Sequence, residues 1–118
     1  MSIFHALILA LVEGLTEFLP VSSTAHLLFT EELLGIQQSE YVKMFTVSIQ
    51  FGAILAVVVA YWKRFFINIQ WTFYRVLAIA VIPALVLGKL FDDKIESVFE
   101  KPLIIAVVLI LGGVVLLF

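Results

Sequence analysis

The sequence contains no cysteine, so it can form neither a disulfide framework nor a thiolate metal site. Charge is scarce as well: 14% of the residues are charged, against about a quarter in soluble domains, and the net charge is -2. The Lys and Arg residues are spread thinly and form no basic stripe, which excludes nucleic acid as a partner. The N-terminus lacks the basic region and the small-residue cleavage site of a signal peptide, so we take it as mature sequence.

What remains is overwhelmingly apolar. Hydrophobic residues make up 64% of the 118 residues, and the mean hydropathy is +1.20. These values lie outside the range of soluble proteins and are typical of an integral membrane protein. The length allows one domain, so we expect a single membrane domain over residues 1–118.

Three apolar stretches are long enough to cross a bilayer as helices. The first, residues 45–62, ends in Trp62 followed by two basic residues, a pattern typical of an anchor at the membrane interface. Gln50 within it is expected to make an interhelical hydrogen bond. Residues 72–90 form the second stretch, and residues 102–118 have just the length to cross. The sequence therefore predicts an all-α, multi-pass protein with about three transmembrane helices.

The two N-terminal apolar stretches are too short to cross. Ile3–Val12 is only ten residues, and a helix of that length covers about 15 Å, half of a hydrocarbon core of about 30 Å. Ala25–Leu34 is equally short, and Pro20 lies in the polar break between the two stretches. We therefore expect a re-entrant helical hairpin over residues 3–34, whose half-length helices meet near the middle of the bilayer.

The polar break reads EGLTEFLPVSSTAH, residues 13–26. Glu13 and Glu17 are four residues apart, which places both carboxylates on one helical face. Two like charges at this depth persist only if one is protonated or if a cation or basic residue lies between them. Carboxylate oxygens are ligands for hard cations, so the pair is a predicted site for a divalent cation, magnesium or calcium.

The residues after Pro20 add anion-binding and nucleophilic groups. Ser22, Ser23 and Thr24 are good N-caps for the second half-helix, and the free amides of such a helix end bind phosphate. Ser22 or Ser23 is available as a nucleophile, and His26 as a general acid or base. Together these groups favour phosphoryl transfer from a lipid-linked phosphate.

Two other functions fit the same pattern. Secondary transporters and lipid flippases also place carboxylates in broken helices at the middle of the membrane, and they move their substrate unaltered. Serine and threonine in membrane helices commonly bond only to the preceding turn or to another helix, so a catalytically inert, self-associating membrane module is the third interpretation.

The segment LVEGLTEFLPVSSTAHL, residues 11–27, closely resembles the first signature of the bacterial undecaprenyl pyrophosphate phosphatase family, the BacA type. The resemblance continues through SIQFGAILAVVVAYWKR and IPALVLGKLFDDKI and covers nearly the whole chain. It implies hydrolysis of the C55 isoprenoid diphosphate to the monophosphate and phosphate at the bacterial inner (plasma) membrane. This reaction recycles the lipid carrier of cell-wall synthesis and usually requires a divalent cation.

The resemblance also implies a role for each residue of the signature. Glu13 and Glu17 correspond to the acidic motif. Ser22 and Ser23 correspond to the catalytic loop, with Ser23 the stronger candidate for the nucleophile. His26 is the histidine of the signature, and the general base stays open between glutamate and histidine.

The chain departs from the family pattern in its length. The resemblance implies members about twice as long, whose second half carries a Pro-Gly-x-Ser-Arg-Ser-x-x-Thr signature with a diphosphate-binding arginine, and this segment is missing here. The family resembles an inverted repeat, of which this chain corresponds to one half. Its basic residues fall four against three on the two sides of the central spans, almost no positive-inside bias. We therefore expect an antiparallel homodimer, or a fragment whose second half is supplied separately.

Overall fold

The structure, a computed structural model, describes residues 1–118 and is helical throughout its regular parts. In chain order the elements are α1 (Ile3–Thr16), α2 (Ser23–Leu33), α3 (Glu40–Ala60), the π-helix η1 (Lys63–Ile67), α4 (Trp71–Phe99) and α5 (Pro102–Leu117). No strand is present, which confirms the predicted all-α class.

Helices α3 and α4 are the two that are long and apolar enough to cross a membrane. α3 begins at Glu40, before the predicted stretch, because the Ser39 hydroxyl caps it by accepting a hydrogen bond from the Val42 amide at 3.2 Å. α4 runs beyond the predicted end at Leu90, but its backbone leaves helical geometry at Phe91. The acidic residues of α4 all lie in the part after Phe91.

Helix α5 is shorter than these two. It has 16 residues and covers about 24 Å, less than a hydrocarbon core of about 30 Å. Its role as a third membrane span therefore stays a prediction.

The chain buries little of its own surface. Only 8 of 118 residues are buried, and α4 has no buried residue. The apolar core consists of Leu9, Ala25, Leu27, Val42 and Ile105. Most large apolar side chains of α3, α4 and α5 are exposed, far more than a water-soluble monomer shows. Lipid or another protein chain must cover this surface, which fits a membrane protein.

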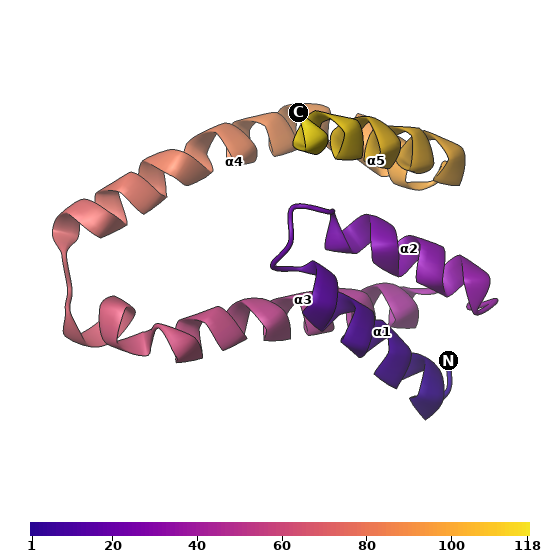
Figure 1. The fold of residues 1–118 in the computed structure, drawn as a ribbon, viewed down its shortest axis with the longest axis horizontal. Coiled ribbons are helices and arrows are strands. Elements are labelled where there is room, and N and C mark those ends of the chain that lie inside the picture. Colours follow the sequence, from indigo (N-terminus) through magenta and orange to yellow (C-terminus); the bar gives the residue numbers. More distant parts are fainter.

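Helices α1 and α2 form a hairpin that packs between α3 and α5 (Figure 1). α3 runs along one side of the molecule, α4 returns along the other, and α5 folds back beside the hairpin. The tip of the hairpin lies level with the middle of α3, because the Gln50 side chain donates a hydrogen bond to the Thr24 hydroxyl at 3.1 Å. Gln50 is the central residue of α3, and the predicted interhelical hydrogen bond is confirmed.

Candidate functional site

The polar break lies where the proline predicted it. α1 ends at Thr16 and α2 begins at Ser23, so residues 17–22 form the break. Ser22 is the N-cap of α2: its hydroxyl accepts a hydrogen bond from the Ala25 amide at 3.4 Å. Its φ of 60° lies in the left-handed region, where residues other than glycine are strained. Such strain persists only where the surrounding structure enforces it, and it is common at functional sites.

The two predicted carboxylates lie together at the end of α1. Glu13 is 1% exposed, and neither of its carboxylate oxygens has a hydrogen-bond partner. Its polar neighbours are the Glu17 carboxylate and the Ser23 hydroxyl. Ser23 is also buried, and its hydroxyl donates a hydrogen bond to Glu17 Oε2. A serine that donates to a carboxylate can pass its proton on as it attacks, which is the arrangement of an activated nucleophile.

The other two predicted residues, Ser22 and His26, contact each other. His26 Nδ1 is 2.9 Å from the Ser22 carbonyl oxygen. A carbonyl oxygen only accepts, so Nδ1 carries the proton, and in the neutral ring Nε2 is left as an acceptor. The Ser22 hydroxyl already caps α2, whereas the Ser23 hydroxyl faces Glu17. Of the two serines, only Ser23 donates its hydroxyl hydrogen to a carboxylate.

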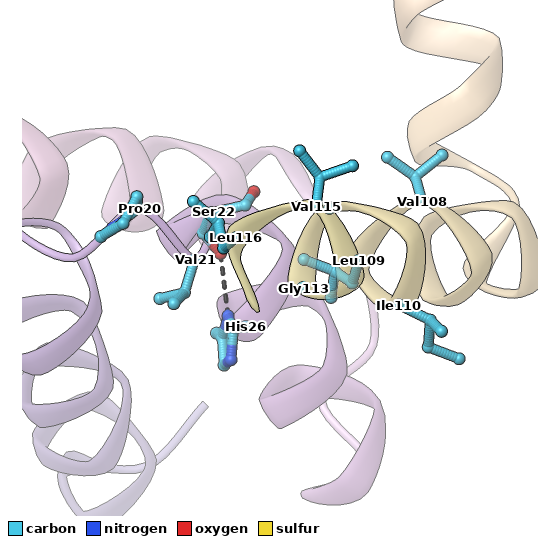
Figure 2. Close-up of a pocket in the computed structure, with 11 residues that line it drawn as sticks. Pro20, Val21, Ser22, His26, Val108, Leu109, Ile110, Gly113, Val115 and Leu116 are labelled. Atoms are coloured by element: carbon cyan, nitrogen blue, oxygen red, sulfur yellow. Dashed lines mark hydrogen bonds between the residues drawn. The ribbon is translucent and has the colours of Figure 1, made fainter. Parts of the chain in front are cut away.

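A groove of about 640 Å³ begins at Ser22 and His26 and continues along α5 (Figure 2). One wall is the polar end of the hairpin, and the other is formed by apolar side chains of α5 such as Leu109 and Leu116. The groove also passes Gly113, where an added Cβ would meet no other atom within 4 Å. A polar end joined to an open apolar channel suits a ligand with a charged head and a hydrocarbon tail.

The structure also reveals a second buried carboxylate that sequence reasoning did not identify. Glu31 is 2% exposed and accepts hydrogen bonds from the Thr46 hydroxyl at 2.9 Å and from the Gln38 side-chain amide. The signal was present in α3: Thr46 and Gln50 are polar residues four positions apart, so they share one face of this largely apolar helix. Both side chains donate hydrogen bonds to residues of α2, so the hairpin is linked to α3 at two positions along the helix.

The donor set of the site is compatible with a cation that the substrate completes. No lysine or arginine pairs with Glu13 or Glu17, since the only ion pair joins Lys43 to Glu40 at 3.5 Å. No group of three His, Cys, Asp or Glu residues able to hold a metal ion is present. Magnesium commonly binds one or two carboxylates and takes its other ligands from water and phosphate. The two free oxygens of Glu13, next to Glu17, fit that pattern and do not form a closed protein cage.

Comparison with known proteins agrees with the signature. The family described as bacitracin resistance protein BacA matches residues 6–118. A relative named undecaprenyl-diphosphatase in Flavobacterium psychrophilum is 50% identical over 117 residues, which cover 99% of this chain and 44% of the relative. Relatives of the same name in Wolinella succinogenes and Bdellovibrio bacteriovorus are 50% and 46% identical, with 99% of this chain and 44% of each relative covered.

The chain thus spans less than half the length of the curated relatives that it matches. No solved structure gives a significant match. The family match extends from α1 to the end of α5 and includes the entire polar break. The chain therefore belongs to the BacA family.

Proposed function

We propose that this chain provides the carboxylate and serine groups for the hydrolysis of a polyprenyl diphosphate, undecaprenyl diphosphate, in the bacterial plasma membrane. The observation that carries the proposal is the hydrogen bond from Ser23 to Glu17, made beside the unpartnered carboxylate of Glu13. The relatives named undecaprenyl-diphosphatase support the choice of substrate.

The hairpin would reach the middle of the membrane as a re-entrant element. α1 and α2 have 14 and 11 residues and cover about 21 and 17 Å, too little to cross. α3 has 21 residues and covers about 31 Å, and its central residue Gln50 bonds to the hairpin tip. If α3 spans the bilayer, the polar break therefore lies at half depth. Irregular backbone at that depth is tolerated when it is buried in protein or lines a wet cavity.

The reaction would proceed by two displacements at the terminal phosphorus. Ser23 Oγ attacks the phosphorus and gives its proton to Glu17, while the bond to the bridging oxygen breaks and the polyprenyl monophosphate leaves with that oxygen. Water then attacks the phosphorylated serine and gives its proton to His26 Nε2. Ser23 Oγ regains its proton from Glu17, inorganic phosphate is released, and His26 Nε2 gives its proton to the departing phosphate or to water.

Glu13 and Glu17 would hold a divalent cation, magnesium or calcium, through their carboxylate oxygens. The bound cation supplies positive charge to the diphosphate oxygens, where negative charge increases during the reaction. Without a cation, two adjacent carboxylates would repel a diphosphate. The proposed role of Glu13 is therefore to bind the cation that attracts the substrate.

The groove along α5 would hold the first isoprene units of the substrate. Its polar end contains Ser22, which directly precedes Ser23 in the chain, and His26, and its α5 wall is apolar. The tail would thus extend into the membrane while the diphosphate stays at the break.

A second repeat would complete the site. No lysine or arginine lines the groove or pairs with the carboxylates. The exposed apolar surface of α4 and α5 is available for contact with another repeat. An antiparallel second copy of this chain or an arginine-bearing second half would both fit this inverted-repeat arrangement. Charge-tagging one terminus tests the first arrangement, because a population that inserts in only one orientation would contradict it.

The test of the function is phosphate release from undecaprenyl or shorter polyprenyl diphosphate by the purified chain in detergent, with magnesium or with chelator. Glu17→Gln and Ser23→Ala should each lower the rate about 10²-fold to 10⁴-fold. The matched controls are Glu32→Gln and Ser48→Ala, since both residues are exposed and lie outside the site. Release that persists in Glu17→Gln and Ser23→Ala would refute the proposed roles. Binding without release would favour a transporter or flippase.

A further inference from the structure

The turn between α3 and α4, residues 61–70, carries a positive charge that the chain does not neutralise. Lys63 and Arg64 lie in this turn, and Arg75 follows in the second turn of α4. No aspartate or glutamate occurs between Glu40 and Asp92, and none of the three cations forms an ion pair. The turn lies at the end of the molecule remote from the α1–α2 hairpin (Figure 1).

Aromatic packing holds Arg64 in place. Its guanidinium lies 4.9 Å from the centre of the Phe73 ring, close enough for a cation–π interaction. Phe73 in turn packs edge-on against Phe65 with 5.7 Å between ring centres. The Tyr74 hydroxyl donates a hydrogen bond to the Phe65 carbonyl oxygen, which closes the turn. The cation is thus positioned before any ligand arrives.

Arg64 lines a small hollow together with two side-chain amides. The hollow has a volume of about 170 Å³ and is lined by Arg64, Asn68, Gln70 and Phe73. No hydrogen bond within the protein occupies the side chains of Arg64, Asn68 or Gln70. A guanidinium and two amides, all with free N–H donors, can surround the oxygens of a phosphate group.

The surroundings of the hollow indicate a lipid as the source of that phosphate. Large exposed apolar side chains flank it on both sides in sequence: Trp62, Phe66, Ile67, Ile69 and Trp71. The turn joins the two helices that are long and apolar enough to cross a membrane. Where these helices span a bilayer, the turn between them lies at the level of the headgroups. Tryptophan is enriched at this level because its ring is amphipathic, and basic residues there attract anionic lipids. A free phosphate ion would use only the polar hollow and not its apolar surroundings.

We propose that the α3–α4 turn binds the headgroup of an anionic phospholipid, with the phosphate in the hollow of Arg64, Asn68 and Gln70. The exposed tryptophans and isoleucines then lie among the upper parts of the acyl chains. This site is separate from the polar break and does not depend on the function proposed above. Lipid bound there would hold the α3 and α4 ends at one membrane face.

The two tryptophans of the chain make this proposal directly measurable, because both Trp62 and Trp71 flank the hollow. The chain is placed in phosphatidylcholine nanodiscs that contain a minor fraction of phosphatidylglycerol. Tryptophan fluorescence is measured with bromine, a quencher, on the acyl chains of either the phosphatidylglycerol or an equal fraction of the phosphatidylcholine. We expect clearly stronger quenching by brominated phosphatidylglycerol. Equal quenching by the two lipids would overturn the proposal.

Variants separate a built site from general charge attraction. Arg64→Gln should weaken the preference for phosphatidylglycerol about tenfold, as for loss of a hydrogen bond to a charged group. Arg64→Lys keeps the charge without the planar fork and should show an intermediate loss. The matched control is Lys94→Gln, because Lys94 also stacks on an aromatic ring, Phe91, at 5.7 Å but has acidic neighbours.

Two results would contradict the assignment. Equal weakening by Arg64→Gln and Lys94→Gln would show attraction by net charge alone. Relief of the quenching by millimolar inorganic phosphate would show a site for free anions and not for a lipid headgroup. A helical circular dichroism spectrum unchanged from the wild type is required of each variant, and Asn68→Ala offers a second probe of the hollow should Arg64→Gln lose its helical signal.

Discussion

The two buried glutamates should respond to the same substitution with opposite changes in stability. Glu13 and Glu31 are 1% and 2% exposed, so both are almost fully removed from solvent. The Glu13 oxygens have no hydrogen-bond partner, whereas Glu31 accepts from Thr46 and Gln38. The two glutamates are therefore equally buried and differ in whether their carboxylate oxygens accept hydrogen bonds.

The expected magnitudes follow from these partners. Glu13→Gln removes an unpartnered carboxylate and its repulsion with Glu17, and the new amide can donate to Glu17. We expect the free energy of unfolding to rise by about 1–2 kcal/mol. Glu31→Gln replaces the charged acceptor of both donors by a neutral amide, and the Thr46 hydroxyl can turn to accept the new N–H, so two charge-assisted hydrogen bonds become weaker neutral ones. We expect the free energy of unfolding to fall by about 1–3 kcal/mol.

The measurement is unfolding by a denaturing detergent, followed by circular dichroism, with a chelator present so that cation binding does not contribute. Glu32→Gln is the control for the loss of a charge at the surface, and we expect a change within about 0.5 kcal/mol. A fall in stability on Glu13→Gln, or the same sign for both buried variants, would refute the reasoning. The first result would mean that Glu13 has a partner that the structure does not show.

Two further predictions concern the neighbours of the break. Gln50→Leu and Thr24→Val, each alone and combined, should reveal a coupling free energy of about 0.6 kcal/mol in the same unfolding measurement. This value is typical of interhelical hydrogen bonds in membranes. Strictly additive effects would show that this bond does not link α2 to α3. Gly113→Leu should extend an apolar side chain into the groove, since an added Cβ at this position has open space around it. It should raise the KM for a long polyprenyl diphosphate about tenfold, by the loss of contact with about two methylene groups, and affect a short substrate less. An equal effect on both substrate lengths would exclude the groove as the tail site.

The sequence by itself determined the features that depend on local order along the chain. The lengths of the apolar runs indicated a membrane protein and placed the end of the apolar part of α4 at Leu90, next to the break in geometry at Phe91. Pro20 and the serines after it placed the break and the N-cap within a residue or two. These features are local because a proline acts on its own turn and a capping hydroxyl on amides two or three residues away. The signature in residues 11–27 identified the family because it is a continuous stretch of sequence.

Tertiary structure alone decided which of two adjacent and chemically identical residues is buried. Ser22 and Ser23 follow each other, as do Glu31 and Glu32. Glu32 is rotated by about 100° from Glu31 around the helix axis, and Ser22 is the N-cap outside the helix that Ser23 begins. Only the packing of α2 against α1 and α3 turns Ser23 toward Glu17 and Glu31 toward Thr46. The groove along α5 could not be predicted from the sequence either, since its lining residues come from opposite ends of the chain. The sequence specifies where the helices begin and end, and their contacts determine which side chains form the site.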